Sequence, residues 1–232
     1  NGSAWTEVND LNDARTSQVG GGTSTAAICI TGSMSPAPSQ VQTETWNGSS
    51  WTEVADLPTT QLSGAGGGSS TSAITCTGQE NPPDSGVQAH AFSWNGSSWA
   101  QLGGDIDGDG CCSAGKSVSL SSDGYSVAVG SSNYVRVFKL VNNSWTKQGS
   151  NITGETPYDN FGFSVSLSSD GSRVAIGGYT NGGGGMNSGH VRVYDFNGTS
   201  WVQAGSDIDG EAAGDQSGYS VSLSSDGSRL AI

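Results

Sequence analysis

Apolar residues occur along this chain in two short-range patterns, and both are typical of β-strands. Val191 and Val193 alternate with polar side chains, and the runs 127–130, 174–177 and 230–232 are almost wholly apolar. A two-residue period puts one face of a strand in a core and the other toward water, whereas a short continuous run is typical of a buried strand. No stripe with helical spacing occurs in the sequence. The pattern predicts an all-β chain.

Turns that join these strands recur at regular intervals. An asparagine-containing turn precedes each of five tryptophans, spaced by 46, 48, 46 and 56 residues: Trp5, Trp51, Trp99, Trp145 and Trp201. Asn-Gly pairs adopt positive φ at low cost and are the strongest short signal of a β-hairpin. Each turn is therefore expected to join two antiparallel strands.

The later half carries a second signature, Val-Ser-Leu-Ser-Ser-Asp-Gly, at 118–124, 165–171 and 221–227. A short apolar strand follows each copy, and the first half has comparable strands at 26–32 and 72–78, each preceded by three glycines that let backbones approach closely. Four strands per roughly 40 to 50 residues is the period of a β-propeller blade. We expect about five four-stranded blades in a single domain spanning residues 1–232.

The terminal blade is expected to be incomplete. The first residues supply one fourth-type strand, and the sequence stops after the second strand of a fifth repeat, so one strand is missing. A ring would close by pairing Trp5–Val8 with Leu230–Ile232. Two explanations stay open: the chain is a fragment of a longer protein, or a neighbouring chain adds the missing strand and builds an assembly.

The two halves resemble different families of propeller repeat. Residues 1–102, with Thr-Glu-Thr-Trp-Asn-Gly-Ser-Ser-Trp-Thr-Glu-Val-Ala-Asp-Leu at 43–57, resemble kelch repeats. Residues 103–232, with Phe-Gly-Phe-Ser-Val at 161–165 and Ser-Gly-Tyr-Ser-Val at 217–221, are similar to FG-GAP repeats of the integrin-α type. Both resemblances imply propellers used mainly for binding, in secreted, cell-surface and viral proteins.

The charge of the chain restricts its partners. The formal net charge is −13, and the first 104 residues contain a single cation, Arg15. Nucleic-acid binding needs clustered cations, so it is not expected. No run of eighteen apolar residues is present, so no membrane span is expected. An acidic surface suits divalent cations or neutral ligands such as glycans, but simple solubility is the favoured explanation of the charge.

Calcium is the sharpest metal hypothesis, because alternating acidic residues on a tight loop can converge their oxygens on a hard cation. One loop offers four acids, Asp207, Asp209, Glu211 and Asp215. A second offers three, Asp105, Asp107 and Asp109. Two departures count against calcium: Ser113 occupies the fourth acidic position of the second loop, and a tight Asp-Gly turn stands where integrin-like repeats place their calcium loop. Ordinary solvated turns are the alternative.

Sequons for N-glycosylation occur at six positions, Asn1, Asn47, Asn95, Asn142, Asn151 and Asn197. All except Asn151 coincide with the hairpin turns, which need asparagine for backbone reasons, so the sequons count as acceptors only in a eukaryotic or eukaryotic-virus setting. Aromatic rings can also stack on sugars. The five recurring tryptophans are expected to pack between sheets, whereas Trp46 and Trp94 are expected to form an exposed ligand-binding pair.

The remaining reactive residues give no catalytic pattern. Cys29 and Cys76 are expected to pack as small apolar residues, and the adjacent Cys111 and Cys112 either form a strained disulfide or stay as free thiols. No nucleophile elbow, phosphate loop or paired-histidine motif occurs, and the two histidines are expected to be packed or hydrogen-bonded. We therefore expect no enzyme.

Two functions fit these observations. The leading hypothesis is an extracellular, cell-surface or virion-surface module that adheres to a glycan or protein ligand through loops at one propeller face. The alternative is a structural repeat protein that self-assembles into a fibre or coat.

Overall fold

A computed structural model describes residues 7–16, 18–33, 39–58, 63–68, 71, 73–78, 89–106 and 115–232. This part of the chain is built of strands and contains no helix, so the predicted all-β class is confirmed. Accordingly, it offers no helix that is long and apolar enough to cross a membrane.

The strands form antiparallel sheets in which chain neighbours are also hydrogen-bonded neighbours. The first sheet contains β1 (Val19–Gly22), β2 (Ala27–Ser33), β3 (Ser39–Trp46) and β4 (Trp51–Val54). The second contains β5 (Ser63–Gly68), β6 (Ala73–Gly78), β7 (Ala89–Trp94) and β8 (Trp99–Gln101).

Two further sheets repeat this order. The third contains β9 (Ser117–Leu120), β10 (Ser126–Gly130), β11 (Tyr134–Val141) and β12 (Ser144–Lys147), with β13 (Ile152–Thr153) also paired to β11. The fourth contains β14 (Ser164–Leu167), β15 (Arg173–Gly178), β16 (His190–Phe196) and β17 (Trp201–Gln203), with β18 (Ile208–Asp209) also paired to β16. The predicted four-strand repeat is confirmed.

A two-stranded antiparallel sheet of β19 (Ser222–Leu223) and β20 (Leu230–Ala231) follows, at the positions predicted for the first two strands of the fifth repeat. The expected closure is not formed by the described residues Glu7 and Val8, which lie outside any strand. The residues that follow Val8 lie against the sheet of β1–β4 instead. Asn9 donates to the Ser49 carbonyl, and Asn12 donates to Glu44.

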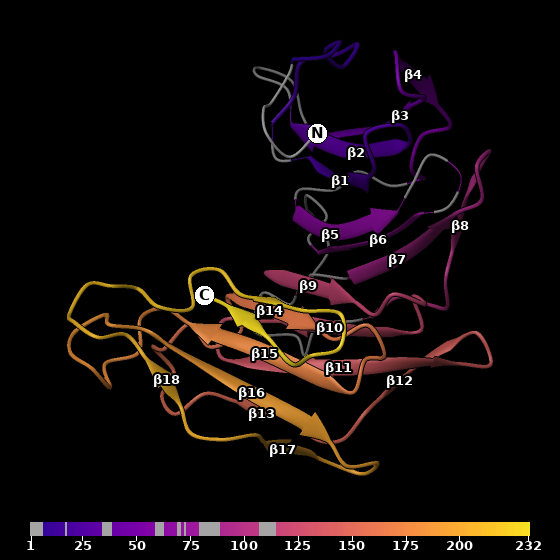
Figure 1. The fold of residues 1–232 in the computed structure, drawn as a ribbon. Coiled ribbons are helices and arrows are strands. Elements are labelled where there is room, and N and C mark those ends of the chain that lie inside the picture. Colours follow the sequence, from indigo (N-terminus) through magenta and orange to yellow (C-terminus); the bar gives the residue numbers. More distant parts are fainter. Residues whose placement is uncertain are drawn as a thin grey trace.

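The sheets lie one after another in chain order, with their first strands adjacent. β1 contacts β5, β5 contacts β9, β9 contacts β14 and β14 contacts β19. Figure 1 shows this succession from the indigo and purple sheets to the orange and yellow ones. The glycine-rich segments of the first half are themselves first strands, β1 and β5, rather than loops.

Hydrophobic cores fill the spaces between successive sheets, and a partly buried tryptophan packs at the side of each. Trp99 flanks the core between the first and second sheets, Trp145 the next core, and Trp201 the core between the third and fourth. Each indole N–H reaches back toward the preceding sheet and donates to Thr43 Oγ1, the Leu102 carbonyl or the Gln148 carbonyl, at 3.1, 2.8 and 3.0 Å. The predicted packing between sheets is confirmed for these three tryptophans, whereas Trp5 lies outside the described residues.

Two repeated contacts hold the later sheets together at their first strands. The hydroxyl of Ser117 donates to the carbonyl of Gly162 at 2.7 Å, and the hydroxyl of Ser164 donates to the carbonyl of Gly218 at the same distance. Gly130 and Gly177 stand beside these carbonyls, and a Cβ on either glycine would lie 2.1 or 2.0 Å from the oxygen. The sheets approach so closely because no side chain stands between the backbones.

We expect replacement of Gly177 with alanine to lower the free energy of unfolding by about 2 kcal/mol, because the new methyl group would overlap the backbone oxygen of Gly218, which is held in place by its hydrogen bond from Ser164. Gly104→Ala is the matched control, since a Cβ at Gly104 would meet nothing within 4 Å. Urea unfolding of both variants measures the difference. Equal stabilities would show that the sheets are not held at this distance.

Candidate functional site

A group of side chains, one of them a lysine and the others aromatic, lies just before the first strands of the last three sheets. Lys116, Phe163 and Tyr219 occupy equivalent positions, each directly after a glycine and directly before the serine of the repeated motif. Those glycines, Gly115, Gly162 and Gly218, have φ of 79°, 104° and 85°. This left-handed conformation favours glycine and sets the direction in which each following side chain leaves the backbone.

The three aromatic rings of Phe163, Tyr179 and Tyr219 pack together and form what we call the aromatic cluster. The ring centroids of Phe163 lie 4.5 Å from Tyr179 and 4.9 Å from Tyr219, and the two tyrosine rings are 5.3 Å apart. Lys116 Nζ lies 5.2 Å from the centre of the Phe163 ring. Tyr219 is 57% exposed, whereas Phe163 and Tyr179 are half-buried. Exposed apolar surface of this kind often marks a binding site.

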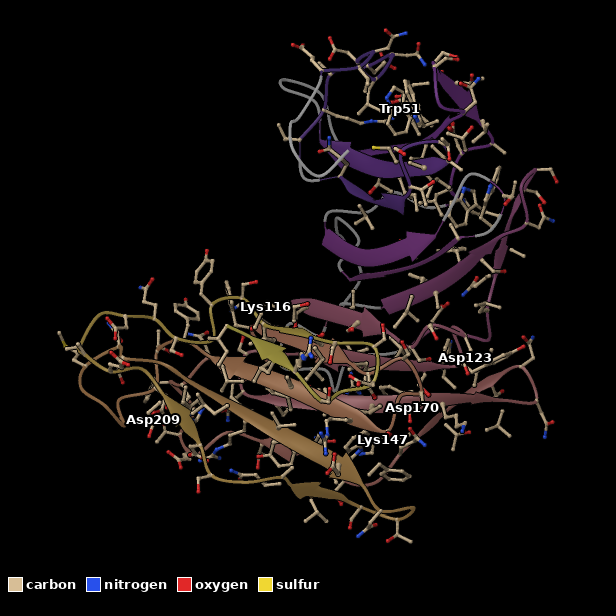
Figure 2. The ribbon with its side chains drawn as sticks, in the orientation of Figure 1. Trp51, Lys116, Asp123, Lys147, Asp170 and Asp209 are labelled. Carbon is tan, nitrogen blue, oxygen red and sulfur yellow. The ribbon has the colours of Figure 1, made fainter. Side chains whose placement is uncertain are left out.

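Polar groups border the aromatic cluster on one side. Lys116 Nζ donates to Asn160 Oδ1 at 3.2 Å, and Asn160 Nδ2 donates to Thr180 Oγ1 at 3.0 Å. In Figure 2, Lys116 lies near the beginning of β9, whereas Asp123 and Asp170 lie toward the other ends of the first strands. The surface therefore combines ring faces with a cation and amide and hydroxyl groups, which is a lining suited to noncovalent recognition.

A second group of polar residues surrounds Arg192 on β16. One guanidinium nitrogen of Arg192 pairs with both Glu155 and Asp207, and its distance to Asp207 Oδ2 is 2.7 Å. The other oxygens of the two acids are also occupied: Gln203 donates to Asp207 Oδ1 and Asn181 donates to Glu155 Oε2. The hydrogen bond from Arg192 lowers the pKa of Asp207, so the carboxylate stays charged beside its cation.

His190 lies fully buried beside this group. Its Nδ1 is 3.8 Å from Asp207 Oδ2, and neither ring nitrogen finds a hydrogen-bond partner among the described residues. Burial lowers the pKa of His190, and the nearby charge of Arg192 acts in the same direction, against the opposing effect of Asp207, Asp159 and Glu155. The imidazole is therefore neutral in the folded protein at pH 7.

The acids of the first predicted calcium loop do not share one centre. Asp207 is engaged by Arg192 and Gln203, and Asp215 accepts a hydrogen bond from the Ala212 N–H at 2.7 Å. Asp209 lies on β18, and both it and Glu211 are exposed. Among the described residues, only one set of three acidic or histidine side chains lies close enough together to hold a metal ion: Glu155, His190 and Asp207. There the guanidinium of Arg192 already pairs with both carboxylates, in the place of a metal ion.

The second predicted loop is described only at its first acid. Asp105 accepts a hydrogen bond from Gln101 at 2.7 Å and lies 3.0 Å from His90 Nδ1. Gln101 and Asp105 thus repeat the relationship of Gln203 and Asp207 two sheets later. Asp107 and Asp109 lie outside the described residues, as do Cys111 and Cys112. Cys29 is a buried free thiol, as expected of a small apolar residue.

The expectation that Trp46 and Trp94 form an exposed pair is wrong. Their exposed fractions are 5% and 2%, because each lies at the end of a third strand and packs against the recurring tryptophan of the fourth strand. The ring centroids of Trp46 and Trp51 are 5.5 Å apart, and those of Trp94 and Trp99 are 5.3 Å apart. A buried ring presents no face to a sugar.

The described turn asparagines of the sequons are exposed, whereas Asn151 is half-buried; Asn1 lies outside the described residues. In the turns, Asn47 Oδ1 accepts hydrogen bonds from the Ser49 and Ser50 N–H groups, and Asn95 and Asn197 repeat this arrangement. These asparagines therefore have a backbone role, as expected. Asn151 lies instead just before β13, at a pocket between the third and fourth sheets.

The aromatic cluster was not predicted from the sequence, although a signal for two of its rings exists there. Phe163 and Tyr219 follow the repeated glycine, and that recurrence could have marked them as neighbours once the sheets were stacked. Tyr179 carries no comparable signal, because it follows β15 at a position that is not aromatic in the other repeats.

Comparison with known proteins gives information on the fold and not on the function. No known family model and no curated protein matches the chain. Among solved structures the chain is similar to the structure of YjhT, with a TM-score of 0.52 and 13% sequence identity over 94% of this chain and 72% of that one. At this identity the similarity concerns the path of the backbone and carries no information on ligands.

Burial of His190 makes stability depend on pH. Because its pKa is lower in the folded chain than the value of about 6.5 expected when unfolded, the unfolded chain binds more protons below pH 6.5, and folding is favoured less as the pH falls. We expect the free energy of unfolding to fall through this group as the pH is lowered from 7 to 5.5. His190→Leu should remove that part of the slope in urea titrations, and parallel curves for the two proteins would contradict the prediction.

Proposed function

We propose that this protein is a non-enzymatic binding module of an extracellular, cell or virion surface, and that it recognises a glycan through the aromatic cluster. The observation that carries the proposal is the packing of Phe163, Tyr179 and Tyr219 beside Lys116 at one end of the first strands. These side chains come from successive repeats, so the surface is formed only when the sheets are assembled.

The architecture proposed for this module is a β-propeller with kelch-like repeats in residues 1–102 and FG-GAP-like repeats in residues 103–232. Supporting observations are the four-stranded antiparallel sheets in chain order and the adjacency of their first strands. In such an arrangement the aromatic cluster lies at the inner edge of one face, where residues from several repeats converge on one ligand.

A neutral glycan suits this surface better than a polyanion does. Sugar rings have apolar C–H faces that pack on aromatic rings, and their hydroxyls bond to groups such as Asn160 and Thr180. The net charge of −13 disfavours polyanions, whereas a neutral ligand meets no repulsion. The exposed sequons in the hairpin turns are consistent with a surface location, since glycosylated asparagines belong to secreted proteins.

The test is glycan-array binding by the purified chain, followed by affinity measurement for the best ligand. We expect Tyr219→Ala to weaken binding roughly tenfold, which corresponds to about 1.4 kcal/mol. Tyr219 is exposed, so the variant should keep its fold.

Tyr125→Ala is the matched control. Tyr125 is 53% exposed, close to the 57% of Tyr219, but it follows the Asp-Gly turn at the opposite end of β9 from Lys116. Equal losses in the two tyrosine variants, or an array with no bound glycan, would overturn the proposal.

A further inference from the structure

A pocket with a volume of about 210 Å³ opens between the third and fourth sheets, at the side of the core that Trp201 flanks. Its lining combines apolar and polar side chains: Ser150, Asn151, Ile152, Thr153, Tyr194, Ser200 and Trp201. The volume is below the range of about 300–1,000 Å³ that is usual for drug-sized ligands, so the pocket suits a single small ring.

The apolar side chains of the pocket are held in place by core packing and by a hydrogen bond. Ile152 and Tyr194 are 5% and 8% exposed and belong to the core between the two sheets. Trp201 is held by its hydrogen bond to the Gln148 carbonyl and by the ring of Phe196, whose centroid lies 5.1 Å away. A ligand therefore meets walls that do not have to be ordered when it binds, which lowers the entropic cost of binding.

The polar part consists of short, uncharged side chains at the rim. Ser150, Thr153 and Ser200 are exposed and offer hydroxyls that both donate and accept hydrogen bonds. Asn151 Oδ1 accepts a hydrogen bond from Lys147 at 3.0 Å, and its Nδ2 has no acceptor among the described residues. An apolar wall opposite several hydroxyl and amide groups matches the two faces of a sugar ring.

We propose that this pocket binds one pyranose ring, which packs on Trp201 and bonds to the hydroxyls and the amide of the rim. The ring has two chemically equivalent sources: a free glycan, or a glycan carried by Asn151 itself, since Asn151-Ile152-Thr153 is a sequon whose asparagine lines the pocket. The proposal shares its ligand class with the proposed function but concerns a different surface, so either can fail alone.

The readout for a free sugar is the indole N–H signal of Trp201 in proton–nitrogen correlation spectra of unglycosylated protein. N-acetylglucosamine, galactose and mannose are titrated separately into the millimolar range. We expect at least one of them to shift this signal in a saturable way. Ser150→Tyr, which fills the pocket from its exposed rim, should abolish the shift.

Ser206→Tyr is the matched control, because Ser206 is the exposed serine at the equivalent position of the fourth sheet. This variant should bind as the unmodified protein does. Tyr219→Ala should leave the Trp201 signal and its shift unchanged, which separates the pocket from the aromatic cluster. A sugar-induced shift that persists in Ser150→Tyr would overturn the proposal.

The second arm uses protein secreted from a eukaryotic host. If the ring belongs to an attached glycan, the Trp201 signal should differ before and after enzymatic removal of glycans. That difference should vanish in Asn151→Gln and persist in Asn197→Gln, where the sequon lies in an exposed turn. The proposal is wrong if neither free sugars nor an Asn151-linked glycan changes the Trp201 signal.

Discussion

Close contact between the backbones of neighbouring sheets is the constraint on which the rest of this structure depends. At Gly130 and Gly177 a Cβ would lie about 2 Å from a carbonyl oxygen of the next sheet, and that oxygen accepts a hydrogen bond from a serine of the same repeat. This contact sets the distance between the third and fourth sheets and between the fourth sheet and the last. It also brings equivalent side chains of successive repeats, such as Phe163 and Tyr219, into ring contact.

The same stacking explains why aromatic residues have two different roles. The tryptophans that begin the fourth strands of the second, third and fourth sheets lie between sheets, and each indole N–H donates to the preceding sheet, so these rings serve packing. The side chains that follow Gly115, Gly162 and Gly218 lie at the surface, near the beginning of the first strands, and remain at least partly exposed to solvent. Position within the repeat, rather than residue type, decides whether a ring is core or surface.

Some charged side chains also occupy equivalent positions in different repeats. Asp105 and Asp207 follow corresponding tryptophans and bind glutamines on the same fourth strands, while a base on the third strand, His90 or Arg192, approaches each acid. Asp105 and Asp207, the first acids of the two predicted calcium loops, therefore take part in contacts between strands. At the fourth sheet Arg192 pairs with Glu155 as well as Asp207, and the neutral ring of His190 lies buried beside this group.

The sequence by itself determined the strands, their order along the chain and their turns. Alternating apolar and polar residues, and Asn-Gly and Asp-Gly pairs, set the backbone conformation within a few residues. The sequence also indicated that the recurring tryptophans pack between sheets. Only the tertiary structure decided that Trp46 and Trp94 are buried, that Asp207 faces Arg192, and that Phe163, Tyr179 and Tyr219 meet at one surface. These outcomes depend on contacts between residues far apart in the chain, and such contacts are fixed by how the sheets stack, which no local pattern encodes.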